Sequence, residues 1–214
     1  MNSYKTIYKE NEYITIEKRS KFIGTALPAE SKADAEEKIK ALQKKYADAT
    51  HNVFAYRVIE GGQVPERQSD DGEPSGTAGM PVLEVLRGEE LYNVVVVVTR
   101  YYGGTLLGTG GLTRAYGHTA KAALGQIIKK EPYRLYSVIV GYSQMGQIQY
   151  EIINNGHILQ DTIYLETVQF MVYTREEQGE GFEKRICDIT HGVTIPSVVR
   201  KLWGFYHEGV FFEG

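Results

Sequence analysis

Apolar and polar residues alternate along much of the first 130 positions, in a pattern that predicts strands interleaved with helices. Residues 14–27 alternate well enough for one or two strands, and residues 51–59 for another, because successive strand side chains point to opposite faces. Residues 93–100 include five consecutive valines and have no polar side, which is typical of a strand buried on both faces. The polar residues 60–75, which contain Gly and Pro, are expected to form a loop.

Three helices are predicted among these strands. Residues 31–46 carry one apolar stripe, formed at spacings of four, three and four by Ala35, Ile39, Leu42 and Tyr46. Ser31 is a suitable N-cap for this helix. Pro81 fits the first position of a short second helix that Gly88 ends. A third helix is expected over residues 112–128, where apolar residues share one face.

The remainder of the chain follows a different order of elements. Glu131-Pro132 is expected to be a linker, which gives one domain over residues 1–130 and a second over residues 133–214. The second domain is predicted to run strand, helix, strand, strand, helix, strand, over residues 133–142, 144–155, 158–164, 167–173, about 177–190 and 198–206. This βαββαβ order is the ferredoxin-like arrangement, so the expected fold class is α+β with two domains.

Charge and composition narrow the function. The chain has 214 residues and a net charge of -3. Residues 1–130 carry 18 Lys and Arg against 16 Asp and Glu, a net charge of +2, whereas residues 131–214 carry 6 against 11, a net charge of -5. No strong basic excess exists, so any contact with RNA is expected through a local patch in the first domain. With a single cysteine, no signal peptide and no long apolar run, a cytoplasmic protein without membrane association is expected.

A glycine-rich segment between the valine strand and the third helix is a candidate anion site. Backbone N–H groups at a helix N-terminus attract anions, and glycines let a bound group come close. Arg100 and Arg114 flank the segment and could add charge-assisted bonds. The spacing matches neither a Walker A loop nor the GxGxxG dinucleotide pattern, and a tight turn alone also explains the glycines. The candidate anion or RNA site comprises Arg100, Tyr102, Gly103, Gly104, Gly108, Gly110, Gly111, Arg114 and Lys121.

The acidic stretch SDDGEPSGTAGMP, residues 69–81, allows two interpretations. Asp70, Asp71 and Glu73 could bind Mg²⁺, or they could form a turn and pair with Arg100 or Arg114. The second interpretation is favoured, with the stretch packed beside the glycine segment and orienting Arg100. No metal or cofactor is therefore predicted.

The sequence shows little sign of a catalytic arrangement of side chains. Nucleophile candidates Ser69, Ser75 and Thr77 have no histidine near them in sequence, although His51 and His118 could approach in space. Tyr101, Tyr102 and Tyr116 lie beside the glycine segment and could stack on a base or pack in the core.

Four segments resemble the signature of the IMPACT family, in particular its bacterial, YigZ-type members. They are KRSKFIG (18–24), DATHNVFAYR (48–57), SDDGEPSGTAGMP (69–81) and VVTRYYGGTLLGTGGLTRAYGHTAKAAL (97–124). The resemblance implies an N-terminal α/β sandwich similar to the second domain of a small-subunit ribosomal protein. It also implies a C-terminal ferredoxin-like domain similar to the last domain of elongation factor G.

The resemblance implies less about function. Eukaryotic relatives are translational regulators, but they act through an additional N-terminal domain that has no counterpart in these residues. Many relatives also carry Lys where this sequence has Leu106, which weakens a strongly basic phosphate site.

Three hypotheses follow. The first is a non-catalytic, translation-linked protein that binds RNA or the ribosome through the anion site. The second is an enzyme acting on a phosphorylated small molecule or nucleotide. The third is an interaction module whose motifs are architectural. The oligomeric state is not predicted.

Overall fold

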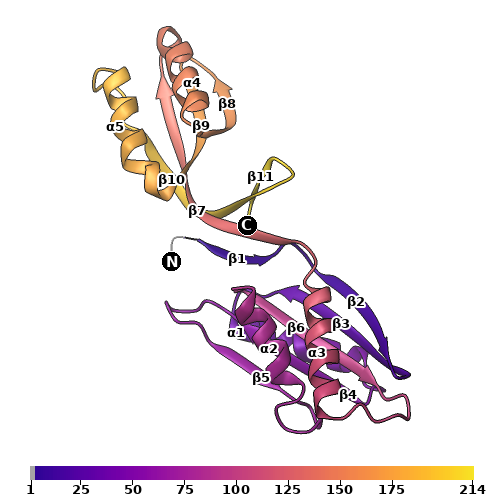
Figure 1. Ribbon diagram of the computed structural model, residues 1–214. Coiled ribbons are helices and arrows are strands. Elements are labelled where there is room, and N and C mark those ends of the chain that lie inside the picture. Colours follow the sequence, from indigo (N-terminus) through magenta and orange to yellow (C-terminus); the bar gives the residue numbers. More distant parts are fainter. Residues whose placement is uncertain (1–2) are drawn as a thin grey trace. The chain divides into compact units, whose positions relative to one another are not determined.

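The computed structural model describes residues 3–214, which divide into two compact units, residues 3–129 and 130–214 (Figure 1). Both units combine helices with sheets, as the expected α+β class requires. Within residues 3–214, no helix is long and apolar enough to cross a membrane.

The first unit is built on a five-stranded sheet in which all neighbouring strands are antiparallel. In spatial order its strands are β2 (Asn11–Glu17), β3 (Ser20–Pro28), β6 (Val94–Tyr101), β4 (His51–Arg57) and β5 (Glu66–Ser69). A short strand, β1 (Tyr4–Ile7), precedes them and forms a parallel bridge from Lys5 to Leu91. The predicted valine strand is therefore the central strand, β6.

Helices cover both faces of this sheet. Helix α1 (Lys32–Lys45) packs on one face with Val95 and Val97, and helices α2 (Gly79–Gly88) and α3 (Thr109–Ala123) pack on the other with Val94, Val96 and Val98 (Figure 1). Because strand side chains alternate between faces, a central strand between two helical layers needs apolar residues throughout. That requirement explains the valine run in an antiparallel sheet.

The second unit has the βαββαβ order predicted from the sequence, followed by one further strand. Its elements are β7 (Ile127–Val140), a 3₁₀ turn (Tyr142–Gln144), α4 (Met145–Asn154), β8 (Ile158–Tyr164), β9 (Val168–Arg175), a second 3₁₀ turn (Glu176–Gln178), α5 (Gly179–Ile189), β10 (Ser197–His207) and β11 (Val210–Glu213). The strand order is β11-β10-β7-β9-β8. Side chains from α4 and α5 form one apolar core with β7 and β9.

Several boundaries differ from the prediction. Glu131-Pro132, expected to be a linker, lies inside β7, because this strand begins at Ile127 and continues to Val140. The third helix is shifted toward the N-terminus, since it begins at Thr109 and ends at Ala123, two residues before Gly125 adopts a φ of +61°. Strands β1, β5 and β11 were not predicted. Strand β5 reads ERQS and has no apolar alternation, so only its pairing with β4 reveals it.

The first helix confirms its predicted cap. Ser31 is extended, and its side chain accepts a hydrogen bond from the Asp34 backbone N–H at 3.1 Å. This contact satisfies one of the free donors of the first turn. Helix α1 therefore has a side-chain cap at its N-terminus, which α3 does not have.

Candidate functional site

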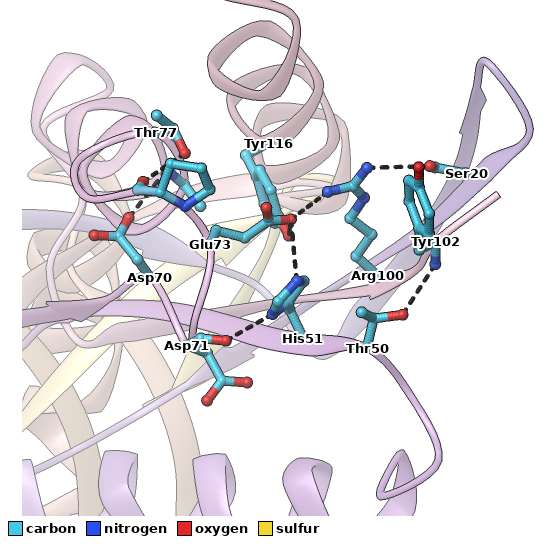
Figure 2. A network of polar contacts seen from close by, with 12 residues as sticks. Ser20, Thr50, His51, Asp70, Asp71, Glu73, Thr77, Arg100, Tyr102 and Tyr116 are labelled. Atoms are coloured by element: carbon cyan, nitrogen blue, oxygen red, sulfur yellow. Dashed lines mark hydrogen bonds and ion pairs between the residues drawn. The ribbon is translucent and has the colours of Figure 1, made fainter. Parts of the chain in front are cut away.

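A buried ion pair lies where the acidic stretch meets β6. The Arg100 Nη1 donates to Glu73 Oε1 at 2.5 Å, and the Tyr116 hydroxyl donates to the same oxygen at 2.7 Å (Figure 2). Both charged side chains are buried, with 6% of Arg100 and 4% of Glu73 exposed. Glu73 therefore neutralises Arg100 inside the protein, and α3 contributes the third partner through Tyr116.

Burial keeps the Tyr116 hydroxyl, the third partner, protonated. Tyr116 lies on the buried face of α3, and its ring packs edge-on against Phe22 at a centroid distance of 5.2 Å. Burial raises the pKa of Tyr116 far above its ordinary value, and the hydrogen bond to the Glu73 carboxylate raises this pKa further. The hydroxyl thus stays protonated and remains a donor to Glu73.

Arg100 has further contacts that hold its guanidinium in place. Its Nη2 donates to Ser20 Oγ at 3.2 Å, and its guanidinium carbon lies 5.4 Å from the ring centroids of both Phe22 and Tyr102. Its Nε is buried and has no hydrogen-bond acceptor within residues 3–214. One donor of this buried cation is therefore unused.

Asp70 organises the start of α2. Its Oδ1 accepts the backbone N–H groups of Ala78 and Gly79 at 3.0 and 2.8 Å, and its Oδ2 accepts that of Gly76 at 2.9 Å. These N–H groups would otherwise be free, because the first turn of a helix has no acceptors of its own. Asp70 thus serves as the missing cap of α2.

Asp71 ties the acidic stretch to β4. Its Oδ2 accepts the Asn52 backbone N–H at 2.6 Å, and its carbonyl oxygen lies 2.7 Å from His51 Nδ1. A carbonyl oxygen only accepts, so this contact places a proton on Nδ1 and turns Nε2 toward Glu73, 3.8 Å from its Oε1 (Figure 2). The sharp turn is completed by positive φ angles of +47° at Asp71 and +88° at Gly72.

The glycine loop, residues 102–111, docks on the β2–β3 turn and leads into α3. Gly103 lies so close to Arg19 that an added Cβ would be 2.1 Å from the Arg19 carbonyl carbon, so only glycine fits here. Its N–H donates to Ser20 Oγ at 3.2 Å. Gly108 then adopts a φ of +74° immediately before α3 begins.

The N-terminus of α3 is uncapped. No side chain in the described part of the chain accepts from its first turn, and that turn contains no acidic residue. The Arg114 side chain folds back over it, since Nη1 lies 3.6 Å from the position of a Cβ on Gly110. A cation and the positive end of the helix dipole therefore share one place, an arrangement that attracts anions.

Two grooves flank this end of α3, on either side of Leu107. The first groove, of about 400 Å³, is lined by Thr50, His51, Glu73, Pro74, Arg100, Tyr102, Leu106, Leu107, Gly108, Thr109 and Leu112. The second groove, of about 500 Å³, is lined by Thr15, Glu17, Lys18, Leu107, Gly111, Arg114, Ala115 and His118. Apolar side chains dominate the first groove, and basic side chains outnumber acidic ones in the second.

The structure thus separates residues that the sequence grouped into one anion site. Arg100 is a buried structural cation rather than an exposed phosphate contact. Arg114 lies in the other groove, and Lys121 pairs with Glu89 at 2.9 Å on the exposed surface. Among the candidate stacking residues only Tyr102 is substantially exposed, at 45%, because Tyr116 is buried in the core.

The acidic residues show no arrangement for a metal. Within residues 3–214 no group of three or more His, Cys, Asp or Glu side chains is placed to hold a metal ion. For Asp70 the favoured interpretation was a turn with pairing to arginine, and Mg²⁺ binding was the alternative; both of its carboxylate oxygens accept backbone N–H groups. Glu73 alone pairs with Arg100, so the expected link between the acidic stretch and Arg100 exists through this one residue.

Sequence reasoning missed several residues of these grooves. Ser20 lies within the quoted KRSKFIG segment, but nothing in that segment indicates that its hydroxyl reaches both Arg100 and Gly103. Thr50 directly precedes β4, and its Oγ1 accepts the Tyr102 N–H at 3.0 Å. Lys18 was noted only as part of a motif. These residues meet through strand pairing, which local sequence does not show.

Comparison with known proteins places the chain in a family. Residues 18–124 match the Impact N-terminal domain, and residues 138–193 match a domain of unknown function, DUF1949. The IMPACT family member YvyE of Bacillus subtilis is 34% identical over 90% of this chain and 89% of its own length, and YigZ of Escherichia coli is 36% identical over 65% and 74%. The crystal structure of a hypothetical protein, 28% identical, aligns with a TM-score of 0.60 over 94% of this chain and 98% of its own. With both domain models matched in order and YvyE aligned over 89% of its own length, this chain belongs to the IMPACT family.

Proposed function

We propose that this protein is a non-catalytic, translation-linked regulator that binds RNA or the ribosome through the N-terminal end of α3. Membership of the IMPACT family supports the link to translation, because the resemblance implies translational regulators among its eukaryotic members. The likeness of the two domains to parts of a ribosomal protein and of elongation factor G stays a prediction.

One observation carries the binding part of this proposal. The uncapped first turn of α3 lies beneath the guanidinium of Arg114, which has no acidic partner in residues 3–214. A folded protein gains nothing from a cation at the positive end of a helix, since the two repel. An RNA phosphate at this position would satisfy both the free N–H groups and the arginine.

The neighbouring β2–β3 turn extends the basic surface. Lys18 lines the same groove as Arg114 and His118, with Glu17 as the only acidic residue among those lining it. A local basic patch is sufficient for phosphate contacts, so binding of RNA does not require an excess of basic residues over the whole chain, whose net charge is -3. Arg100 and Lys121 are not part of this surface, since each already has an acidic partner.

The test is co-sedimentation of the full chain with ribosomes and with total tRNA over a series of salt concentrations. The variant Lys18→Ala/Arg114→Ala should bind at least about tenfold more weakly at low salt, and its affinity should depend less on salt, because fewer counterions are released. A matched control is Lys40→Ala/Lys44→Ala, which removes the same charge from the exposed side of α1.

The comparison of the two variants decides the outcome. Loss of pelleting with the first variant alone supports the proposal. Equal pelleting of both variants would remove the α3 end as the binding surface. No pelleting of the wild-type chain at low salt would remove RNA and ribosome binding altogether.

A specific observation favours a second candidate, the interaction module with architectural motifs. Asp70, Asp71 and Glu73 all accept hydrogen bonds from the protein itself. The enzyme hypothesis assigned these same carboxylates to a metal or a general base, so the contacts remove its main support. The interaction module requires that the Lys18→Ala/Arg114→Ala variant pellet with ribosomes as wild type does, if it pellets at all.

A further inference from the structure

The groove on the other side of Leu107 has the features of a small-ligand site. Its volume of about 400 Å³ lies within the range of about 300–1,000 Å³ that is usual for such sites. Leu106, Leu107, Leu112 and Pro74 give it apolar walls. The polar groups that line it come from Thr50, His51 and Thr109 and from the ion pair of Glu73 and Arg100, which neutralise each other. Lys18 and Arg114 line the other groove, whereas Leu107 and the first turn of α3 border both grooves.

An aromatic ring is held at the groove in a fixed position. The Tyr102 backbone N–H donates to Thr50 Oγ1 at 3.0 Å, and the Arg100 guanidinium carbon lies 5.4 Å from the ring centroid. The side chain is nevertheless 45% exposed. A ring that is supported by a buried cation and open to the groove suits stacking with a second planar, aromatic group.

Unused hydrogen-bond donors border the same groove. The backbone N–H groups of Thr109, Gly110 and Gly111 have no acceptor among the described residues, and Thr109 lines the groove. Independently, Arg100 also lines it, is 95% buried, and has an Nε without an acceptor within residues 3–214. Protein donors that are buried or aligned at a helix start and lack acceptors call for an anionic or oxygen-rich ligand.

We propose that this groove binds one nucleotide, with its base stacked on Tyr102 and its phosphate at the N-terminus of α3. The ligand must combine a flat aromatic part with a phosphate, because the groove offers an aromatic and aliphatic slot at one end and free N–H donors at the other. A free nucleoside 5′-monophosphate and the terminal nucleotide of an RNA strand share this chemistry. The second source rests on the proposed function above, whereas the first does not.

The experiment is a titration of the full chain, followed by amide chemical shifts in two-dimensional NMR spectra. The probes are AMP and UMP, adenosine without phosphate, ribose 5-phosphate without base, and a tetranucleotide with a 5′-phosphate. The monophosphates should bind at least about tenfold more tightly than adenosine or ribose 5-phosphate. The largest shifts should fall on Tyr102 and on residues 108–112.

Two substitutions separate the two ends of the ligand. Tyr102→Ala should weaken binding of AMP about tenfold or more, and Tyr102→Phe should retain it, since only the ring is needed. Thr109→Pro removes one free N–H at the first helical position, where proline is well tolerated, so the fold should persist. This variant should bind AMP about fivefold more weakly and bind adenosine with unchanged affinity.

The outcomes distinguish the groove from the proposed function. Tighter binding of the tetranucleotide than of AMP identifies an RNA end as the source, and equal or weaker binding identifies the free nucleotide. Equal affinity for AMP and adenosine, or an unaltered Tyr102→Ala variant, overturns the nucleotide site. Ribosome pelleting that depends on Lys18 and Arg114 would then still stand, because these two side chains line the other groove and do not line this one.

Discussion

The acidic stretch, residues 69–81, and the glycine loop, residues 102–111, line the same groove but differ in their hydrogen bonds. In the acidic stretch each of the three carboxylates accepts a donor from the protein, and Asp70 caps α2. In the glycine loop the chain turns directly into α3 and leaves its first N–H groups without acceptors in the described residues. One segment completes the fold, and the other leaves a helix end open.

The difference shows that charged residues that stand out in a sequence can be engaged in the fold itself. Asp70, Asp71 and Glu73 are the most conspicuous functional groups in the sequence, yet their contacts explain them structurally. The glycines carry no functional group, but they expose backbone donors beside Arg114 and Tyr102. A free donor is a stronger indication of a ligand than a satisfied carboxylate.

The largest expected effect comes from breaking the buried ion pair. Glu73→Ala leaves Arg100 buried without its counter-charge, and loss of one partner of such a pair costs about 3–5 kcal/mol. Measured by denaturant unfolding of the full chain, the transition of the first unit should shift strongly toward lower denaturant. Glu84→Ala is the control, because Glu84 pairs with Arg87 on the surface and should cost less than about 1 kcal/mol.

The contrast between the acidic stretch and the glycine loop would fail if Glu73→Ala and Glu84→Ala lowered the free energy of unfolding by the same small amount. The acidic stretch would then not be needed for the fold, and its carboxylates would be free for another role. A double variant, Glu73→Ala/Arg100→Ala, should lose less than the sum of the single variants, since removing both charges leaves no unpaired one.

A smaller effect is expected at the helix cap. Asp70→Ala removes the acceptor for the Ala78, Gly79 and Gly76 N–H groups, which should cost about 1–2 kcal/mol in the free energy of unfolding. Asp70→Asn keeps one carbonyl oxygen at this position and should lose less. Ligand binding at α3 should be unchanged in both variants, and a loss of nucleotide or ribosome binding by folded Asp70→Asn would contradict the purely structural role assigned here.

Much of the fold was predictable because its signals are local. The valine run marked the central strand β6, Ser31 marked the start of α1, and residues 158–164 were predicted as a strand with the bounds that the structure shows for β8. Family motifs identified the first domain, and residues 18–124 match the Impact N-terminal domain. The failures were local as well, since β5 has no apolar pattern and β7 runs through an expected linker that contains proline.

The contacts of the candidate site residues could not be predicted from the sequence, and their role in binding stays a prediction. Sequence grouped Arg100, Arg114 and the glycines, but in the structure Arg100 and Arg114 line different grooves. It did not show that Arg100 points inward to Glu73, because this depends on the alternation of β6 and on how α3 covers the sheet. It also did not reveal Ser20 and Thr50, which reach the loop only through pairing of distant strands.

The smallest expected effect, that of glycine-to-alanine substitutions in α3, separates a role in the fold from a role in binding. Gly110→Ala and Gly117→Ala both place a methyl group in α3 at ordinary contact distances, 3.6 Å from Arg114 Nη1 and 4.0 Å from Pro81, respectively. Each should stabilise the protein by up to about 0.5–1 kcal/mol, because alanine favours helix more than glycine does. Only Gly110→Ala, at the open helix end, should weaken AMP or RNA in the titrations. If both variants bind as wild type does, Gly110 is not needed for close approach of a phosphate. A stability gain paired with a binding loss at Gly110 alone would mean that the glycine is kept for the ligand and not for the fold.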